Sequence, residues 1–292
     1  MSAQTLGFIG LGVMGEPMCG NLARKSGLPV VATDLKPEPL ERLAADGVRA
    51  LASVADVAAS ADIVFLSLPS VAEVEAVCFG PGGLVNAPGR RVSTVVDMST
   101  SDVVRTRRLA QRLAAAGIAF ADAPVARTRE AARLGTLLIT VGAADDRFAA
   151  LEPLLACMGS DVVHCGPTGC GQVVKIMNNM VLLVTVNALA EALAIGRAAG
   201  VDGKLLLETL SMGSADSFAL RGPGLKALVP GVFPEQAFPT DYALKDMRLA
   251  LELARSGAVP VVVAPATAEL LARTSQAGHG SAYYPAMYRL LG

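Results

Sequence analysis

Short apolar runs alternate with segments of helical periodicity along the first half of the chain. The runs are mostly uninterrupted, which is typical of strands covered on both faces. Two helical patterns are clear, over 14–26 and 102–116, and the second stops before Gly117, a favourable residue beyond a helix end. The alternation predicts an α/β fold with a doubly wound sheet. The predicted strands cover 5–10, 29–34, 62–68, 92–98, 118–122, 136–142 and 161–165.

After residue 168 the strand pattern disappears and helical patterns follow one another. The segment 169–200 is apolar on most faces and predicts a single helix of about 28 residues. We therefore expect an α/β domain over 1–167 and an all-α domain over 168–292, built on this long helix. A helical domain so apolar is expected to bury surface in a homodimer or homotetramer, unless it closes its core by itself. Further helices are predicted over 203–212, 240–256, 265–276 and 283–291.

The composition narrows the possible partners. The 292 residues are 52% hydrophobic and 17% charged, which suits two well-filled domains. The net charge of −1 gives no basic surface for nucleic acid, and the low aromatic content without tryptophan argues against base stacking. The long apolar segment carries Asn178, Asn179, Asn187 and Glu191, which favours a buried helix over a membrane span.

The cysteine and histidine content favours a reducing compartment and argues against metal chemistry. The five cysteines form no C-x-x-C pair and lie in apolar surroundings, so we expect buried, reduced thiols. The start of the chain lacks the basic region of a signal peptide, and the expected location is the cytoplasm. With two histidines and no cluster at metal-ligand spacing, we expect no metal site.

The stretch "GFIGLGVMGEPMCGNL" places Gly10, Gly12 and Gly15 in G-x-G-x-x-G spacing between a predicted strand and a predicted helix. In this context the first glycine permits the tight turn, the second lets a pyrophosphate approach the backbone, and the third lets the helix pack closely on the strand. A glycine turn that only packs is the alternative. The pattern predicts a Rossmann dinucleotide-binding domain. Its cofactor-binding turn comprises Gly10, Leu11, Gly12, Val13, Met14 and Gly15.

An acidic residue ends the second predicted strand. Asp34 lies at the distance from the glycine turn that suits a ribose-binding carboxylate, which accepts bonds from both ribose hydroxyls and repels a 2′-phosphate. The following residues offer Lys36 but no arginine, so we expect NAD, as NAD+ or NADH, rather than NADP. The alternative for Asp34 is a solvated loop carboxylate.

Two further strand ends are expected to face the cofactor, because ligands of such sheets bind outside the carboxyl ends of the strands. Leu68 and Pro69 lie at the C-terminal end of the third strand, and Ser99 and Thr100 at that of the fourth. For Ser99 and Thr100 a helix N-cap is the competing interpretation, since a helical pattern starts just after them, and the two roles are also compatible if each falls to one residue.

Lys175 and Asn179 lie four residues apart near the start of the long helix, so they share one face. A lysine in an apolar helix is costly unless it is paired or functional, and no histidine suits the role of general acid or base. Burial lowers the pKa of an ammonium group, which eases proton exchange near neutrality. From spacing alone, a lysine that snorkels out of the first helical turn is an equally good interpretation.

Five motifs occur in the order found in the β-hydroxyacid dehydrogenases: "GFIGLGVMGEPMCGNL", "DMSTS", "DAPV" followed by "GTL", "GCGQVVKIMNNM" and "LKDMRLALELA". Nearly the whole chain resembles this family, which includes 3-hydroxyisobutyrate dehydrogenase and tartronate semialdehyde reductase. The resemblance implies a Rossmann domain, a helical domain built on the interdomain helix, and a cleft between them. It also implies Lys175 as the catalytic acid–base and Asn179 as a substrate-orienting residue. Thr100 is then expected near the nicotinamide ribose and Lys245 beside the cofactor.

One loop departs from the family pattern. Many members read D-A-P-V-S-G-G and bind the substrate carboxylate there, whereas this chain has Ala126, Arg127 and Thr128 in place of Ser-Gly-Gly. The Arg-Thr pair resembles the sulfolactaldehyde reductase branch, where it holds a sulfonate, and a guanidinium beside a hydroxyl suits a sulfonate or a carboxylate. Alternatively, Arg127 turns to solvent or pairs with Glu130. The other arginines of this segment, expected to be solvated, are Arg129 and Arg133.

Together these features predict an NAD-dependent oxidoreductase for a small acid that carries a hydroxyl or aldehyde group near its anionic end. Lys175 exchanges the proton, Asn179 steadies the substrate oxygen, and Arg127 with Thr128 holds the anion in place. Sulfolactaldehyde and succinic semialdehyde are the leading substrates, followed by 3-hydroxyisobutyrate and tartronate semialdehyde. A non-catalytic binding module and an imine reductase are less favoured, because Lys175 is present.

Overall fold

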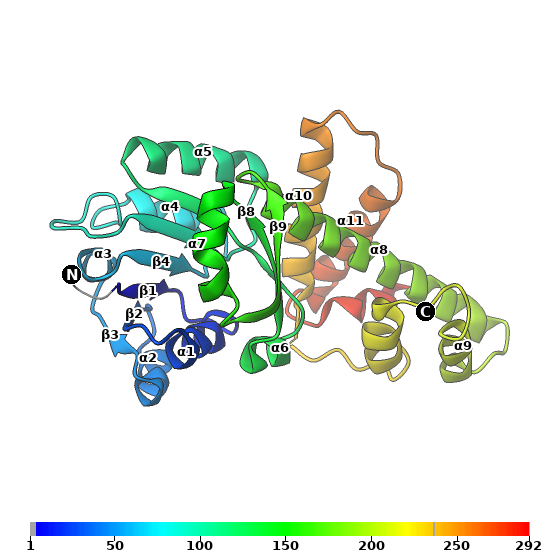
Figure 1. Ribbon diagram of the computed structural model, residues 1–292. Coiled ribbons are helices and arrows are strands. Elements are labelled where there is room, and N and C mark those ends of the chain that lie inside the picture. Colours follow the sequence, from blue (N-terminus) through cyan, green and yellow to red (C-terminus); the bar gives the residue numbers. More distant parts are fainter. Residues whose placement is uncertain (1–3, 236, 292) are drawn as a thin grey trace. The chain divides into compact units, whose positions relative to one another are not determined.

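The computed structural model describes residues 4–235 and 237–291. The chain divides into two compact units, a first up to Lys175 and a second from Ile176. The division falls inside one long helix, α8 (Cys170–Ala198), which therefore belongs to both units (Figure 1). The boundary expected near Thr168 lies just ahead of this helix.

A mostly parallel sheet forms the centre of the first unit. Its strands run in the order β3-β2-β1-β4-β5-β6, and β8 extends the sheet antiparallel to β6, with β7 and β9 both paired to β8. The predicted doubly wound sheet is confirmed. Strands β3 and β7 were not predicted, because each has only two residues, which are too few to form an apolar run. The bounds are β1 Leu6–Ile9, β2 Val30–Thr33, β3 Arg49–Ala50, β4 Ile63–Leu66, β5 Thr94–Asp97, β6 Ala119–Asp122, β7 Val125–Ala126, β8 Leu137–Gly142 and β9 Gly159–Gly166.

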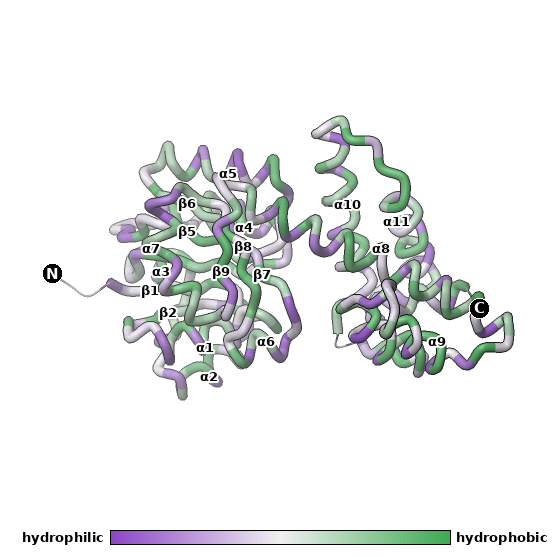
Figure 2. Tube along the Cα trace, turned by 45° about the vertical axis from the view of Figure 1, so that its right-hand side comes forward, coloured by the Kyte–Doolittle hydropathy of each residue, from purple (hydrophilic) through white to green (hydrophobic). Residues whose placement is uncertain are grey.

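Helices cover both faces of this sheet. Apolar residues of α1, α6 and α7 join one hydrophobic cluster, and those of α3, α4 and α5 join another. Polar and apolar residues alternate along the turns of α5, as an amphipathic covering helix requires (Figure 2). The bounds are α1 Gly15–Ser26, α2 Pro37–Leu43, the 3₁₀ turn η1 Ala44–Asp46, α3 Val54–Ser60, α4 Val71–Phe79, α5 Val103–Ala115, α6 Arg129–Leu134 and α7 Asp145–Leu155.

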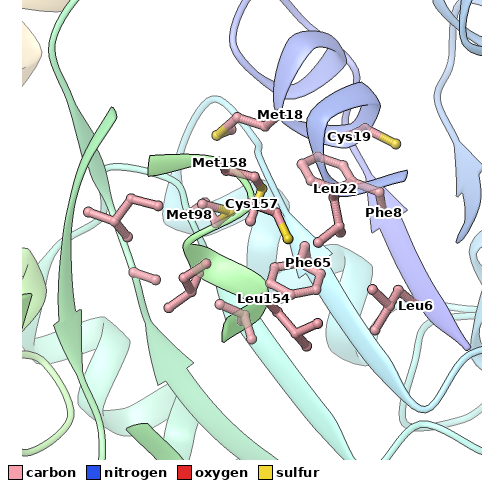
Figure 3. Packing of buried hydrophobic residues seen from close by; sticks show 14 of the residues in the cluster. Leu6, Phe8, Met18, Cys19, Leu22, Phe65, Met98, Leu154, Cys157 and Met158 are labelled. Carbon is pink, nitrogen blue, oxygen red and sulfur yellow. The ribbon is translucent and has the colours of Figure 1, made fainter. Parts of the chain in front are cut away.

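The two clusters follow from the alternation of side chains along each strand. In β1, Phe8 joins the cluster under α1 and α7, whereas its neighbour Ile9 joins the cluster on the opposite face. Phe65 of β4 stacks on Phe8 at 6.2 Å between ring centroids, and Figure 3 shows both rings among the buried methionines and leucines. A sheet buried on both faces leaves its strand ends as the place for a ligand.

The named elements among the described residues of the second unit are all helices, as predicted, and an isolated β-bridge joins Pro239 and Tyr283. The long helix α8 has 29 residues, close to the predicted length. By length and composition alone it also meets the requirements of a membrane-spanning helix, as core helices of soluble proteins do. The other bounds are α9 Gly203–Leu210, the π-helix η2 Leu220–Leu228, α10 Thr240–Ser256, α11 Val263–Thr274, the π-turn η3 Ser275–His279 and the 3₁₀ helix η4 Tyr284–Leu290.

Candidate functional site

The glycine turn after β1 has the geometry of a dinucleotide-binding turn. Gly10 has a φ of +91°, in the left-handed region, and a Cβ there would lie 2.3 Å from the carbonyl oxygen of Ser67. A Cβ on Gly15 would lie 2.0 Å from the carbonyl oxygen of Gly10, so neither position admits a side chain. A Cβ on Gly12, in contrast, would meet no atom within 4 Å. The backbone is therefore open at the one glycine that a pyrophosphate must approach.

Asp34 lies next to this turn. Its carboxylate accepts hydrogen bonds from the backbone N–H groups of Leu11 (2.5 Å) and Lys36 (2.8 Å), so it is not a solvated loop residue. The side chain of Leu11 is buried, that of Met14 is half-buried, and that of Val13 is 61% exposed at the start of α1. The turn and the carboxylate predicted to bind the ribose thus form one hydrogen-bonded unit.

A buried polar network shapes the ends of β4 and β5. The backbone N–H of Leu68 donates to the hydroxyl of Ser99 (2.9 Å), and Asp97 accepts bonds from the Ser99 N–H (2.9 Å) and the Ser101 hydroxyl (3.2 Å). Gln172, on the first turn of α8, donates to the carbonyl oxygen of Ser99 (2.7 Å) and accepts from the Ser101 N–H (3.0 Å). These bonds tie both strand ends to the start of α8.

The tips of these two loops carry the other residues predicted at the cofactor. Pro69 is exposed after β4, and Thr100 is half-buried between the two serines that the network fixes. The competing interpretation of Ser99 and Thr100 as helix caps is wrong. The cap of α5 is Asp102, whose carboxylate accepts from the N–H of Arg105 (2.6 Å). Asp102 lies closer to the start of the helix than Ser99 or Thr100 does.

Asp122, at the end of β6, holds the N-terminus of α8. Its buried carboxylate accepts from the backbone N–H groups of Gly169 (2.6 Å) and Gln172 (2.8 Å). The helix approaches the sheet very closely here, since a Cβ on Gly171 would lie 2.4 Å from the carbonyl oxygen of Thr140. Asp122 belongs to the "DAPV" motif of the sequence, but its partners lie about 50 residues further along the chain. Local sequence patterns therefore could not predict these hydrogen bonds.

Asp97 and Asp122 are register partners on neighbouring strands, and both are fully buried. Burial raises the pKa of Asp97 to about 6, while hydrogen bonds from Ser99 and Ser101 lower it. Burial also raises the pKa of Asp122 to about 6, against the lowering effect of its bonds to the start of α8. At both carboxyl groups, desolvation therefore has a larger effect on the pKa than hydrogen bonding has.

Lys175 and Asn179 lie four residues apart on α8, as predicted. Lys175 is half-buried, whereas Asn179 is buried with its amide nitrogen 2.6 Å from the carboxylate of Asp246 on α10. The Asn179 oxygen accepts from the amide of Asn178 (3.1 Å), so both ends of its amide are oriented. Lys245 forms an ion pair with Asp246 at 3.6 Å. Sequence reasoning missed Asp246, although it stands inside the quoted "LKDM" motif.

Arg127 lies beyond the end of β7, with a φ of +87°. Its guanidinium donates to the carbonyl oxygen of Thr136 (2.7 Å) and the hydroxyl of Ser160 (2.8 Å), and it forms an ion pair with Asp161 (2.7 Å). The hydroxyl of Ser160 and then the guanidinium of Arg127 lower the pKa of Asp161. Ala126 is buried in β7. The guanidinium thus holds a carboxylate, and the carboxylate belongs to the protein itself.

The rest of this segment forms the short helix α6. Thr128 caps it, because its hydroxyl accepts from the N–H of Ala131 (3.2 Å). The alternative pairing of Arg127 with Glu130 is wrong, since Glu130 pairs with Arg133 at 3.5 Å and the guanidinium of Arg127 contacts Ser160 and Asp161 of β9. Whether Arg127 and Thr128 bind a substrate anion stays a prediction.

The arrangement fits an NAD cofactor. The open backbone at Gly12, the helix N-terminus behind it and the carboxylate of Asp34 are the groups that a pyrophosphate and a ribose require. Within residues 4–235 and 237–291, no group of three or more histidine, cysteine, aspartate or glutamate side chains has the geometry of a metal site.

Comparisons with known proteins agree with this geometry. Residues 5–166 match a family model described as the NAD-binding domain of 6-phosphogluconate dehydrogenase, and residues 169–291 match one described as NAD-binding of NADP-dependent 3-hydroxyisobutyrate dehydrogenase. The chain is 39% identical over 256 residues to 2-(hydroxymethyl)glutarate dehydrogenase of Eubacterium barkeri, covering 88% of this chain and 84% of that protein. The chain belongs to the 3-hydroxyisobutyrate dehydrogenase-like family of β-hydroxyacid dehydrogenases.

Members of this family resemble the chain over nearly its full length. Human mitochondrial 3-hydroxyisobutyrate dehydrogenase is 35% identical over 99% of this chain and 87% of its own. The solved structure of Mycobacterium tuberculosis 3-hydroxyisobutyrate dehydrogenase with L-serine has a TM-score of 0.88 at 27% identity and covers 99% of both chains. An imine reductase from Myxococcus stipitatus with NAD+, at 17% identity and a TM-score of 0.67, shares the fold alone. The first unit is therefore an NAD-binding domain, and the chain is related to hydroxyacid dehydrogenases.

Proposed function

We propose that the protein is an NAD-dependent dehydrogenase that interconverts a small anionic hydroxy acid and its semialdehyde, with Lys175 as the general acid–base. The observation that carries this proposal is the anchoring of α8 at the cofactor strand ends. Gln172 bonds to Ser99 and Ser101 on the β5 loop, and Lys175 follows it by less than one helical turn. The lysine is thus carried by an element fixed to the loop that holds Thr100.

The proposed roles follow from what each side chain can donate. NADH supplies the hydride when it is bound. The ammonium group of Lys175 donates a proton to the substrate oxygen during reduction, and the neutral amine removes it during oxidation. Asn179, oriented by Asp246 and Asn178, donates a hydrogen bond to the same oxygen.

Two substrate classes have separate support. The names of the relatives favour a carboxylate with a primary alcohol, of the 3-hydroxyisobutyrate or 2-(hydroxymethyl)glutarate kind. The Arg-Thr replacement at Arg127 and Thr128 favours sulfolactaldehyde or succinic semialdehyde, but the guanidinium of Arg127 already holds Asp161. We therefore place the substrates named by the relatives first, and sulfolactaldehyde and succinic semialdehyde second. Tartronate semialdehyde belongs with the first.

For the cofactor we propose NAD in preference to NADP. A 2′-phosphate on the ribose would meet the carboxylate of Asp34, whose two oxygens already accept backbone hydrogen bonds. Like charges at this distance repel, and no arginine follows Asp34 directly to offset them. Comparing kcat/KM with NADH and NADPH on one substrate tests this preference.

The decisive experiment combines a substrate panel with a lysine variant. NADH oxidation is measured with 3-hydroxyisobutyrate-type, tartronate, succinic and sulfonated semialdehydes. Lys175→Ala is expected to lower kcat on the best of them by roughly a hundredfold or more while NADH binding is unchanged. Lys204→Ala, at an exposed lysine of α9, is the control and retains activity. Full turnover in Lys175→Ala would refute the assigned role.

The remaining proposals concern assembly and location. Large apolar side chains of the helical unit are exposed, among them Met212 (82%), Ile195 (69%) and Phe218 (66%), which supports a homodimer or homotetramer that light scattering would detect. The described cysteines are free thiols, which supports the proposal of a reducing, cytoplasmic location. We propose no nucleic-acid or membrane partner.

A further inference from the structure

The side chain of Gln172, on the first turn of α8, is fully buried and bonded at both ends of its amide. Its nitrogen donates to the carbonyl oxygen of Ser99 (2.7 Å), and its oxygen accepts from the backbone N–H of Ser101 (3.0 Å). Burying an amide is costly unless such bonds compensate for the lost water. The side chain therefore bridges α8 to the loop after β5, which carries Thr100 between the two serines.

This bridge is separate from the attachment of α8 to β6. The carboxylate of Asp122 accepts from the backbone N–H groups of Gly169 and Gln172, so it holds the start of the helix without any help from the Gln172 side chain. A helix held at one point can still turn about its axis, whereas attachments to two different strands fix its rotation. The Gln172 amide therefore adds orientation to a helix start that Asp122 already holds.

Gln172, Lys175 and Asn179 lie on one face of α8, because spacings of three and seven residues bring side chains to the same side of a helix. Gln172, at one end of this row, is bonded to the β5 loop. Asn179, at the other end, donates to the carboxylate of Asp246 (2.6 Å). Lys175 lies between these two fixed residues, so the rotation that Gln172 gives to α8 also sets the direction of the lysine.

We propose that Gln172 is a positioning residue, which directs the ammonium group of Lys175 toward the β5 loop that carries Thr100. It acts through Lys175 and contacts no reacting atom itself. This inference rests on the proposed function, because the direction of Lys175 matters only if Lys175 exchanges the proton. Loss of the amide is expected to lower kcat, since proton transfer requires close placement of the acid. NADH binding, which depends on the glycine turn and Asp34, is expected to stay unchanged.

Steady-state kinetics of Gln172→Met and Asn187→Leu, on the best substrate of the panel, test the proposal. Methionine has a similar length to glutamine but cannot form the two bonds, and kcat is expected to fall by roughly tenfold or more. Asn187 is the matched control, because it is also a buried amide of α8 and donates to the hydroxyl of Thr267 (3.2 Å), away from the strand ends. Asn187→Leu is expected to keep the wild-type kcat. Thermal denaturation sets an assay temperature at which both variants are folded.

A third variant, Gln172→Glu, is expected to recover activity at low pH. A protonated carboxyl group can donate to the carbonyl oxygen of Ser99 and accept from the N–H of Ser101, as the amide does, whereas a carboxylate can only accept. The neighbouring carboxyl groups are Asp97, bonded to both serines, and Asp122, bonded to the backbone N–H of residue 172. The kcat of Gln172→Glu relative to the wild type at the same pH is expected to rise as the pH falls, and this ratio removes titrations common to both proteins. The corresponding ratio for Gln172→Met stays constant.

Three results would overturn the positioning role. Folded Gln172→Met has the wild-type kcat, or Asn187→Leu loses as much kcat as Gln172→Met, which would show a general effect of a changed buried amide. The third is a relative kcat of folded Gln172→Glu that does not change with pH. Full turnover in Lys175→Ala contradicts the proposed function instead. An inactive Lys175→Ala beside a fully active Gln172→Met overturns the positioning role alone.

Discussion

At the residue scale, the two outer glycines of the cofactor turn differ from the middle one in what a methyl group would meet. The Cβ of an alanine at Gly15 would lie 2.0 Å from the carbonyl oxygen of Gly10, a backbone atom that has little room to move. At Gly12 the same methyl group meets nothing within 4 Å. We therefore predict that the glycine at position 15 is required for folding, whereas the glycine at position 12 is required for binding of the cofactor.

This difference gives a paired prediction. Gly15→Ala is expected to lower the melting temperature strongly or to leave the protein insoluble, because the helix start must separate from the strand. Gly12→Ala is expected to melt like the wild type but to bind NADH at least about tenfold more weakly, since the methyl group occupies the path of the pyrophosphate. Thermal denaturation and NADH fluorescence titration measure the two effects. Unchanged NADH affinity in Gly12→Ala would contradict the assignment of the turn.

Arg127 and Asp161 give a second prediction at this scale, which depends on the proposed function. If Arg127 binds the substrate anion, Asp161 competes for the same guanidinium. Asp161→Asn is then expected to lower KM for the anionic substrate by about two- to fivefold, the range typical of an exposed ion pair. Arg127→Ala is expected to raise that KM and leave KM for NADH unchanged.

Glu130→Gln is the matched control, because Glu130 pairs with Arg133 instead. Its KM should equal that of the wild type. A KM that stays the same or rises in Asp161→Asn would show that the Arg127 pair only fastens the end of β7 to β9.

At the scale of elements, the first turn of α8 depends on a single buried carboxylate. Asp122→Ala would leave the backbone N–H groups of Gly169 and Gln172 without their acceptor. The free energy of unfolding is expected to fall by roughly 2–3 kcal/mol, the cost of buried donors left unpaired. Because Lys175 lies on the following turn, kcat is also expected to fall. Asp122→Asn, which keeps one acceptor oxygen, should lose less in both measurements.

Urea unfolding and steady-state kinetics on the same preparations test this prediction. A stability loss in Asp122→Ala with an unchanged kcat would mean that the start of α8 does not position Lys175. An unchanged free energy of unfolding would mean that water molecules accept the hydrogen bonds that the carboxylate of Asp122 accepts in the wild type.

Elements with a strong local signal were the predictable part of the fold. The apolar runs marked every strand of four residues or more, and the length of α8 followed from its uninterrupted apolar segment. β3 and β7 have only two residues, and the π-helix η2 contains Gly222, Pro223 and Gly224, which disfavour a helix. In the candidate site, the glycine turn and Asp34 lie in one local motif. Asp161 and Asp246 were missed because their partners come from distant strands or helices.

At the scale of the whole molecule, the buried carboxyl groups link stability to pH. The pKa of Asp97 is about 6 in the folded chain, against an ordinary value of 3.8, because burial raises it. Between these two pH values the unfolded chain releases a proton that the folded chain keeps. The contribution of Asp97 to the free energy of unfolding therefore falls as the pH rises through this window, and the loss is complete above about pH 6. Asp122 acts in the same direction.

Asp97→Asn isolates this effect, since the amide keeps the shape and has partners in Ser99 and Ser101 but carries no ionisable proton. The stability of the wild type relative to Asp97→Asn is expected to fall by roughly 1–3 kcal/mol from pH 4 to pH 7, measured by urea unfolding. Asp161→Asn provides a control of opposite sign. The pKa of Asp161 is lowered, first by Ser160 and then by Arg127, so its stabilising contribution is lost as the pH falls. A difference between wild type and Asp97→Asn that stays constant or grows with pH would mean that the Asp97 carboxyl is not desolvated in the folded state.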